Sequence, residues 1–156
     1  RMTQQEVKDE FKETEGKPEV KQKVRQLQRE MAQRRMMEDV PQADVVITNP
    51  EHYAVALQYE GQSMAAPIVV AKGADEIAGK IMEIAREHKV DVLRTPPLAR
   101  AVYHNTEIGE PIPEGLYMAV AQVLAYLFQL RQYRRRGGRK PVMPRLPIPS
   151  DLRRDE

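Results

Sequence analysis

The asparagine–proline pair at Asn49 and Pro50 is the part of this sequence best suited to a chemical reaction. Asparagine usually decays through attack by the backbone N–H of the next residue, and proline has no such group. What remains is attack by the Asn49 side-chain amide nitrogen on its own backbone carbonyl carbon. That reaction closes a succinimide, expels Pro50 and breaks the chain. Asparagine followed by proline is also an ordinary turn signal, so a simple turn is the alternative interpretation.

Two ionisable residues follow the pair directly, Glu51 and His52. The imidazole of a histidine titrates near neutral pH, so His52 is suited to take a proton from the attacking amide or to give one to the leaving nitrogen of Pro50. The Glu51 carboxylate lies beside the bond that breaks and is suited to stabilise a protonated His52. The alternative for His52 is a local hydrogen bond at the start of the next strand.

Strand-forming residues on both sides place this pair in a hairpin turn. Segments 44–48 and 53–59 are rich in β-branched and apolar residues, and Pro50 sets φ for the first central turn position. The second segment is apolar on both faces, with Tyr53, Val55, Leu57 and Tyr59 on one and Ala54 and Ala56 on the other. The second strand is therefore predicted to lie inside the sheet, with helices on both sides.

The remaining pattern predicts an α/β fold with a small central four-stranded mixed sheet flanked by helices. Five further elements are expected: a strand at 67–71, a helix at 75–88, a strand at 90–94, a short helix at 98–103 and a long helix at 114–133. The strand, helix and strand between residues 67 and 94 predict a right-handed parallel crossover. The broad apolar surface of the last helix marks it as the core helix.

The chain is expected to have three regions: a linker with an amphipathic helix at 1–39, a globular domain at 40–133, and a basic, proline-rich tail at 134–156. The polar residues before position 18 are expected to be weakly helical or disordered when alone. The helix after them is predicted from apolar residues at helical spacing, Val20, Val24, Leu27 and Met31. The prolines of the tail favour an extended, disordered segment over a packed one.

Composition disfavours several classes of function. With no cysteine there is no disulfide framework, no thiol nucleophile and no cysteine-based zinc site. The three histidines lie far apart in the sequence, so no metal site or other cofactor is expected. No Gly-x-Ser-x-Gly segment is present, which disfavours a serine hydrolase. The longest apolar stretch, residues 116–130, is shorter than the about 20 residues that span a bilayer, so no membrane-crossing helix is expected here.

The turn and the strand after it resemble the self-cleaving motif of the flagellar and injectisome type III export switch proteins, with the flagellar branch as the better match. The shared residues run from Asn49 through Leu57. The likeness continues in family order over residues 65–74, 96–103, 107–109 and 116–121, so it covers about residues 40 to 130. One residue departs from the family pattern, which usually has threonine where this chain has Glu51.

The resemblance implies a fragment of an export-apparatus component at the cytoplasmic face of the bacterial inner membrane, joined to membrane-spanning helices upstream. Such a protein docks rod- and hook-type export substrates and then switches to filament-type substrates, in a step linked to self-cleavage between Asn49 and Pro50. The implied partners are these substrates, the hook-length control protein and other export-gate components, with no nucleic acid. Cleavage is a single event without turnover, so the resemblance implies no enzyme in the ordinary sense.

The resemblance also points to a small apolar docking patch for export substrates, made by Ala66, Pro67, Ala121 and Leu124. Ala121 and Leu124 are three residues apart on the predicted last helix and therefore neighbours on its surface. Small side chains beside a leucine leave a shallow concavity that a short apolar export signal would fill. The alternative is that all four are ordinary core residues.

Two functions of other classes stay open. From Arg131 onward the chain has nine Lys and Arg against three Asp and Glu, which favours phosphate contacts by a nucleic-acid-binding module. The first predicted helix has a face of lysines and arginines, which favours contact with anionic lipid headgroups.

Overall fold

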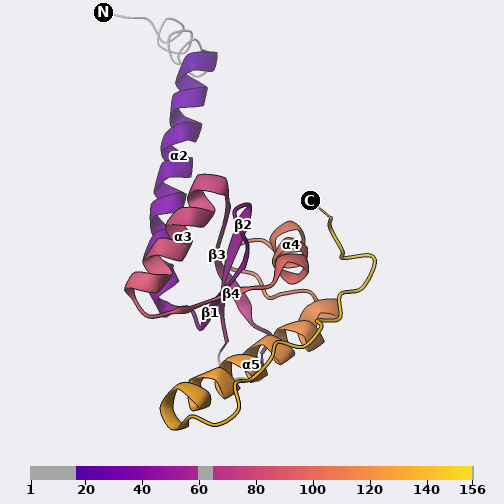
Figure 1. Ribbon diagram of the computed structural model, residues 1–156. Coiled ribbons are helices and arrows are strands. Elements are labelled where there is room, and N and C mark those ends of the chain that lie inside the picture. Colours follow the sequence, from indigo (N-terminus) through magenta and orange to yellow (C-terminus); the bar gives the residue numbers. More distant parts are fainter. Residues whose placement is uncertain (1–16, 60–64, 156) are drawn as a thin grey trace, which may run out of the picture. The chain divides into compact units, whose positions relative to one another are not determined.

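The computed structural model describes residues 17–59 and 65–155 (Figure 1). The predicted linker at 1–17 falls almost wholly outside these residues. The elements in chain order are α2 (Pro18–Asp39), η1 (Val40–Gln42), β1 (Val45–Asn49), β2 (Tyr53–Gln58), β3 (Ile68–Ala74), α3 (Asp75–Glu87), β4 (Asp91–Arg94), α4 (Pro96–Asn105), η2 (Glu114–Leu116) and α5 (Tyr117–Arg136). The predicted α/β fold with a four-stranded sheet is confirmed. The chain divides into two compact units, residues 1–36 and 37–156.

The sheet of the second unit is mixed, in the order β3-β2-β1-β4. β1 pairs antiparallel with β2 over five residue pairs and parallel with β4 over four. β2 pairs antiparallel with β3 on its other side, so it lies inside the sheet as its two apolar faces predict. β1 is the other inner strand, and its first four residues are all buried. The residues just before Asn49 are therefore held from both sides.

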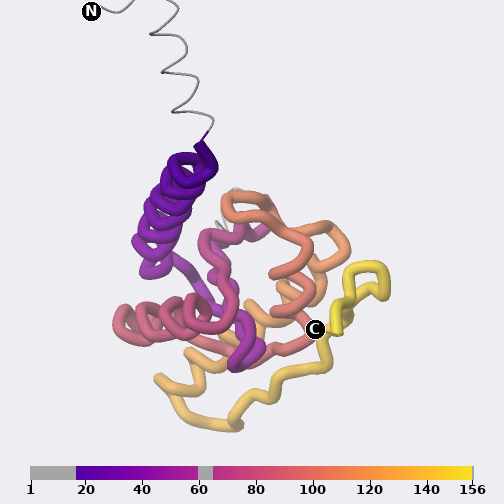
Figure 2. Tube along the Cα trace, turned by 90° about the horizontal axis from the view of Figure 1, so that it is seen from above, coloured from indigo at the N-terminus to yellow at the C-terminus, as the bar shows by residue number. Residues whose placement is uncertain are grey.

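The predicted parallel crossover joins the two edges of the sheet. β3 and β4 run in the same direction, since β1 is antiparallel to β2, β2 is antiparallel to β3, and β4 is parallel to β1. They are not neighbours, because β2 and β1 lie between them. α3 connects them across the whole sheet and contacts β2, β3 and β4. Figure 2 shows α3 and α4 on opposite sides of the strands.

Helices cover both faces of the sheet. α3 buries Ala78, Ile81 and Ala85, which lie on one face of the helix; of the residues expected to face inward, Ile81 and Ala85 are buried and Ile77 and Ile84 are half-buried. On the opposite face, one core cluster joins side chains of all four strands to α4 and α5. Its largest buried members include Ile47, Leu57, Leu98, Leu116 and Val102. The predicted role of the last helix as a core helix is confirmed, since α5 buries Ala119, Val120, Val123, Leu127 and Leu130.

α2 is confirmed as a helix and begins at Pro18, where a proline without N–H is tolerated. Its predicted apolar positions, Val20, Val24, Leu27 and Met31, are all exposed. No helix of the described residues is long and apolar enough to cross a membrane.

The bounds of the elements differ from the predicted ones by up to three residues; β3, for example, was predicted at 67–71 and runs from Ile68 to Ala74. α4 begins at Pro96 instead of residue 98, because prolines fit the first turn of a helix and need not precede it. The long helix predicted from residue 114 begins as the 3-10 turn η2 and becomes α-helical only at Tyr117.

The expectation that the proline-rich tail does not pack was wrong for the described residues. Beyond Gly137 the chain has no helix or strand, as predicted, but it runs back along the globular unit (yellow in Figures 1 and 2). Met143, Leu146, Ile148 and Leu152 pack against the core cluster. Prolines prevent regular structure without preventing packing, and the apolar residues between them supply the buried surface.

Candidate functional site

The Asn–Pro pair lies at the tip of the hairpin between the two inner strands. Asn49 is the last residue of β1 and pairs with Tyr53, the first residue of β2. The backbone N–H of His52 donates a hydrogen bond of 2.7 Å to the carbonyl oxygen of Asn49, which closes the turn. Pro50 and Glu51 occupy the two central positions and are exposed, as the turn signal predicts. The peptide bond between them is cis.

The residue before Asn49 is fixed by β4. The backbone N–H of Thr95 donates to the carbonyl oxygen of Thr48 at 2.9 Å, and the Thr48 hydroxyl donates to the Leu93 carbonyl at 3.3 Å. The Thr48 side chain is 2% exposed, so these hydrogen bonds are shielded from water. Asn49 therefore extends from a rigid, buried strand into an exposed turn.

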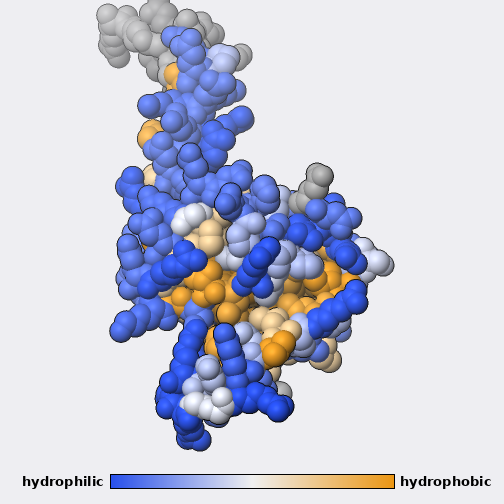
Figure 3. Space-filling model, viewed as in Figure 1, coloured by the Kyte–Doolittle hydropathy of each residue, from blue (hydrophilic) through white to orange (hydrophobic). Residues whose placement is uncertain are grey.

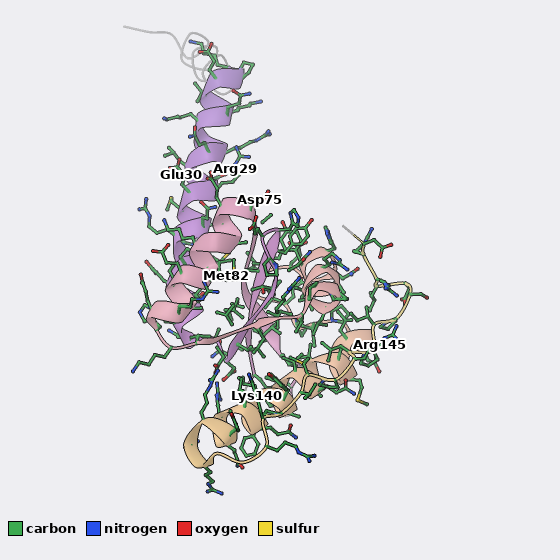
Figure 4. The ribbon with its side chains drawn as sticks, viewed as in Figure 1. Arg29, Glu30, Asp75, Met82, Lys140 and Arg145 are labelled. Carbon is green, nitrogen blue, oxygen red and sulfur yellow. The ribbon has the colours of Figure 1, made fainter. Side chains whose placement is uncertain are left out.

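A second chain segment, the junction of β3 and α3, lies against the turn. Tyr53 of β2 pairs with Ala74, the last residue of β3, so the next residue, Asp75, lies beside the turn (Figure 4). The backbone N–H of Asp75 donates to the carbonyl oxygen of His52 at 2.9 Å. The Asp75 carboxylate lies 4.0 Å from Nδ1 of His52. Both side chains are largely exposed, so this charge interaction is weak.

Aromatic side chains continue the site from His52 toward α4. Tyr53 stacks on Tyr103 with ring centroids 4.4 Å apart, and His104 contacts Tyr53 edge-on at 5.2 Å. Lys72 of β3 donates to the Tyr103 carbonyl at 2.8 Å and lies 4.9 Å from the centre of the Tyr103 ring. Burial raises the pKa of Tyr103, and the nearby Tyr53 and Asp75 raise it further. The cluster ties the start of β2 to the end of α4.

The structure brings the predicted reactive residues together and adds partners that the sequence analysis missed. Asn49, Pro50 and His52 form one turn closed by a hydrogen bond, whereas Asp75 and Tyr103 were not predicted to lie near it. A signal for Asp75 was available, since a strand antiparallel to β2 must end beside the place where β2 begins. No group of His, Asp and Glu in the described ranges has the geometry to hold a metal ion.

The four residues of the predicted docking patch differ in burial. Pro67 is buried, Ala66 and Leu124 are half-buried against the core cluster, and Ala121 is exposed. They therefore span the boundary between core and surface, and the core interpretation fails for Ala121. α5 exposes three more apolar side chains that were not predicted, Tyr117, Met118 and Phe128. Figure 3 shows apolar residues gathered on one face of the globular unit, with charged residues around them.

The fold and the turn define a small α/β domain built around an Asn–Pro hairpin. The chain belongs to the FlhB, HrpN, YscU and SpaS family, whose family model matches residues 1–127. It is similar to the flagellar biosynthetic protein FlhB of Salmonella typhimurium, with 59% identity over 153 residues, 97% of this chain and 40% of that protein. It is also similar to FlhB of Bacillus subtilis, with 51% identity over 132 residues, 85% of this chain and 37% of that protein. The chain thus spans well under half the length of these relatives.

Solved structures agree with the fold. The crystal structure of the cytoplasmic domain of FlhB from Shewanella putrefaciens matches with a TM-score of 0.74 and 57% identity, over 78% of this chain and 95% of that one. A mutated EscU C-terminal domain matches with a TM-score of 0.55 and 29% identity, over 58% of this chain and 90% of that one.

Proposed function

We propose that this chain is the part of a flagellar type III export component that docks export substrates and switches their specificity, linked to self-cleavage between Asn49 and Pro50. Membership of the family and similarity to FlhB support the place in the export apparatus. One observation supports the chemistry above all: the hydrogen bond of 2.7 Å from the His52 N–H to the carbonyl oxygen of Asn49. That carbonyl belongs to the bond that would break.

The reaction needs only residues of the turn. Nδ2 of Asn49 attacks the Asn49 carbonyl carbon, a carbon–nitrogen bond forms, and negative charge collects on the carbonyl oxygen. The His52 N–H already points at this oxygen and stabilises the charge, as a donor in an oxyanion hole does. The bond to Pro50 then breaks. His52 accepts the proton that Nδ2 loses and delivers one to the departing nitrogen of Pro50. The products are a succinimide at Asn49 and a new N-terminus at Pro50.

The strand order explains how the domain would survive the break. β1 is the last element before the broken bond, and β2 and β4, its neighbours on both sides, come after it. The upstream piece therefore stays inserted between two strands of the downstream piece, with nine backbone residue pairs across the two edges of β1. The tip of the hairpin is released while the sheet persists. The freed turn and its neighbourhood change shape, which is the proposed switch.

Substrate docking is assigned to the surface around Ala121. This residue is exposed, and Leu124 and Ala66 lie half-buried beside the core. Rod- and hook-type substrates, the hook-length control protein and other export-gate components are the proposed partners. The proposed location is the cytoplasmic face of the inner membrane. The single break without turnover makes the chain a self-processing switch and no ordinary enzyme.

The test compares the chain with its Asn49→Ala variant. Intact mass measured over time is expected to show the parent near 17.9 kDa giving way to two species that divide after Asn49. The variant, which lacks the attacking nitrogen, is expected to stay whole and to unfold at the same temperature, because the changed side chain lies at the tip of a turn. In cells, the full-length variant is expected to export hook-type substrates and to fail in the change to filament-type substrates.

Two outcomes contradict the proposal. Two fragments from the Asn49→Ala variant would exclude cyclisation by this asparagine. A single species from the unchanged chain after prolonged incubation at neutral pH would exclude self-cleavage.

A further inference from the structure

Asp75 has a backbone conformation that its position does not explain. Its φ is +53°, in the left-handed region that favours glycine. Among the described residues other than glycine, only Lys89 shares this feature, with φ of +59°. Lys89 follows the end of α3, where helices commonly finish with a left-handed residue. Asp75 begins α3, where no such rule applies. A glycine would fit this backbone with less strain, so the aspartate side chain is the feature to explain.

Helix capping does not explain it. Ala74 is the cap residue of α3, and the start of the helix has no side-chain capping hydrogen bond. A carboxylate in the first turn does favour the helix dipole, but Glu76 lies in the same turn and supplies the same charge in an ordinary conformation.

The contacts of Asp75 converge on His52. The left-handed backbone directs the Asp75 N–H to the His52 carbonyl oxygen at 2.9 Å, and the carboxylate lies 4.0 Å from Nδ1 of the His52 ring. His52 in turn donates its N–H to the Asn49 carbonyl oxygen. The same residue thus supports the two groups that the proposed reaction uses, the N–H donor and the imidazole.

We infer that Asp75 is a positioning residue for self-cleavage: it orients the His52 ring through its carboxylate and holds the His52 backbone through its N–H. This inference rests on the proposed cleavage between Asn49 and Pro50. A carboxylate at Nδ1 leaves Nε2 free to receive the proton from the Asn49 amide and stabilises the imidazolium that forms. The Asp75 carboxylate itself exchanges no proton in the proposed reaction.

Substitutions at Asp75 can separate the contribution of its carboxylate from that of its backbone conformation and N–H. Asp75→Asn keeps the shape, tolerates the left-handed conformation and retains the N–H. Asp75→Gly relieves the backbone strain and also lacks the carboxylate. Glu76→Gln is the matched control, because it removes the neighbouring charge of the same helix turn and leaves Asp75 and His52 unchanged. Thermal unfolding of each variant verifies the fold before cleavage is timed.

The first-order rate constant of cleavage, measured by intact mass at neutral pH, is the readout. Both Asp75 variants are expected to cleave about two- to fivefold more slowly than the unchanged chain, the size that an exposed charge pair supports. Glu76→Gln is expected to cleave at the unchanged rate. In a His52→Ala background, Asp75→Asn is expected to have no further effect, because its target is gone.

Each other result overturns the inference. Equal rates for the unchanged chain and Asp75→Asn would show that the carboxylate does not act. If Glu76→Gln slows cleavage as much as Asp75→Asn does, the effect comes from the negative charge in the first turn of α3. If Asp75→Asn slows cleavage equally in the His52→Ala background, Asp75 acts by a route that does not involve the His52 side chain. If the unchanged chain does not cleave at all, the proposed function fails together with the inference. If the unchanged chain cleaves and Asp75→Asn cleaves at the same rate, only the inference about Asp75 fails.

Discussion

Gly73 and Ile77 lie in direct contact where β3 passes into α3. A β-carbon added to Gly73 would lie 2.2 Å from Cγ2 of Ile77, far closer than two carbon atoms approach. Gly73 is also paired with Ala54 of β2, so it cannot retreat from the helix without leaving the sheet. The missing side chain thus lets α3 start close to the hairpin, and this close start places Asp75 beside His52.

Gly73→Ala is therefore expected to lower the free energy of unfolding by about 1–3 kcal/mol, the usual effect of overpacking a tight contact. The control is Gly79→Ala on the exposed side of α3, where an added β-carbon meets nothing within 4 Å. That change is expected to raise the free energy of unfolding by about 0.5–1 kcal/mol, since alanine favours the helix. Urea unfolding of both variants measures the difference. Equal effects of the two changes would contradict the close contact.

Glu51→Thr is expected to speed self-cleavage by about two- to fivefold. Glu51 is exposed at the centre of the turn, and its negative charge disfavours the charge that collects on the neighbouring Asn49 carbonyl oxygen. Glu51→Gln separates charge from shape, because it keeps the side-chain length and removes the charge. Both variants are followed by intact mass over time. Identical time courses for all three chains would show that this residue does not influence the reaction.

The two pieces produced by cleavage are expected to stay together in native buffer and to separate in denaturant. The upstream piece contributes the inner strand β1, in which Val45, Val46 and Ile47 are fully buried. Removing it would expose this apolar surface and leave unpaired backbone groups on β2 and β4. Size-exclusion chromatography followed by denaturing electrophoresis measures both states. Separate native elution of the two pieces would show that the sheet does not hold them.

Ala121→Asp is expected to leave stability nearly unchanged, within about 0.5 kcal/mol, and to abolish binding of a hook-type export substrate. Ala121 is exposed on α5, so an aspartate there stays in water. Ala119→Asp is the matched control on the same helix, because Ala119 is 0% exposed and a buried, unpaired carboxylate is strongly destabilising. Thermal unfolding and substrate binding are measured on both variants. Normal substrate binding by a stable Ala121→Asp protein would remove this residue from the docking surface.

Local patterns sufficed to predict the hairpin and the helices. The alternation of Tyr53 to Leu57 and the proline after Asn49 are encoded within a few residues, so strand, turn and strand could be predicted directly. The order of the strands in the sheet could not be predicted in this way. The pairing of β1 with β4 joins residues 46 positions apart, and nothing in the local pattern favours it over a pairing of β4 with β3.

The candidate site, too, could be predicted from the sequence only in part. Asn49, Pro50 and His52 could be found because their chemistry lies in adjacent residues. Asp75 was missed. An antiparallel pairing of β3 with β2 places it beside the turn, but its left-handed backbone and its contacts with His52 follow from no local pattern. The packing of Leu152 was missed for a related reason: a proline-rich composition excludes helices and strands but says nothing about which surface an irregular segment covers.

The position of β1 also bears on the order of events during protein synthesis. β1 leaves the ribosome before both of its neighbours, and its contact with β4 joins Thr48 to Leu93, a separation of 45 residues. The hydrogen bond from Thr95 to Thr48 forms only after residue 95, which lies between β4 and α4, has emerged. A nascent chain that stops short of β4 thus lacks the rigid support behind Asn49. Under the proposed chemistry, a truncated chain keeps its backbone whole, and the break becomes available only to a polypeptide that has completed its sheet.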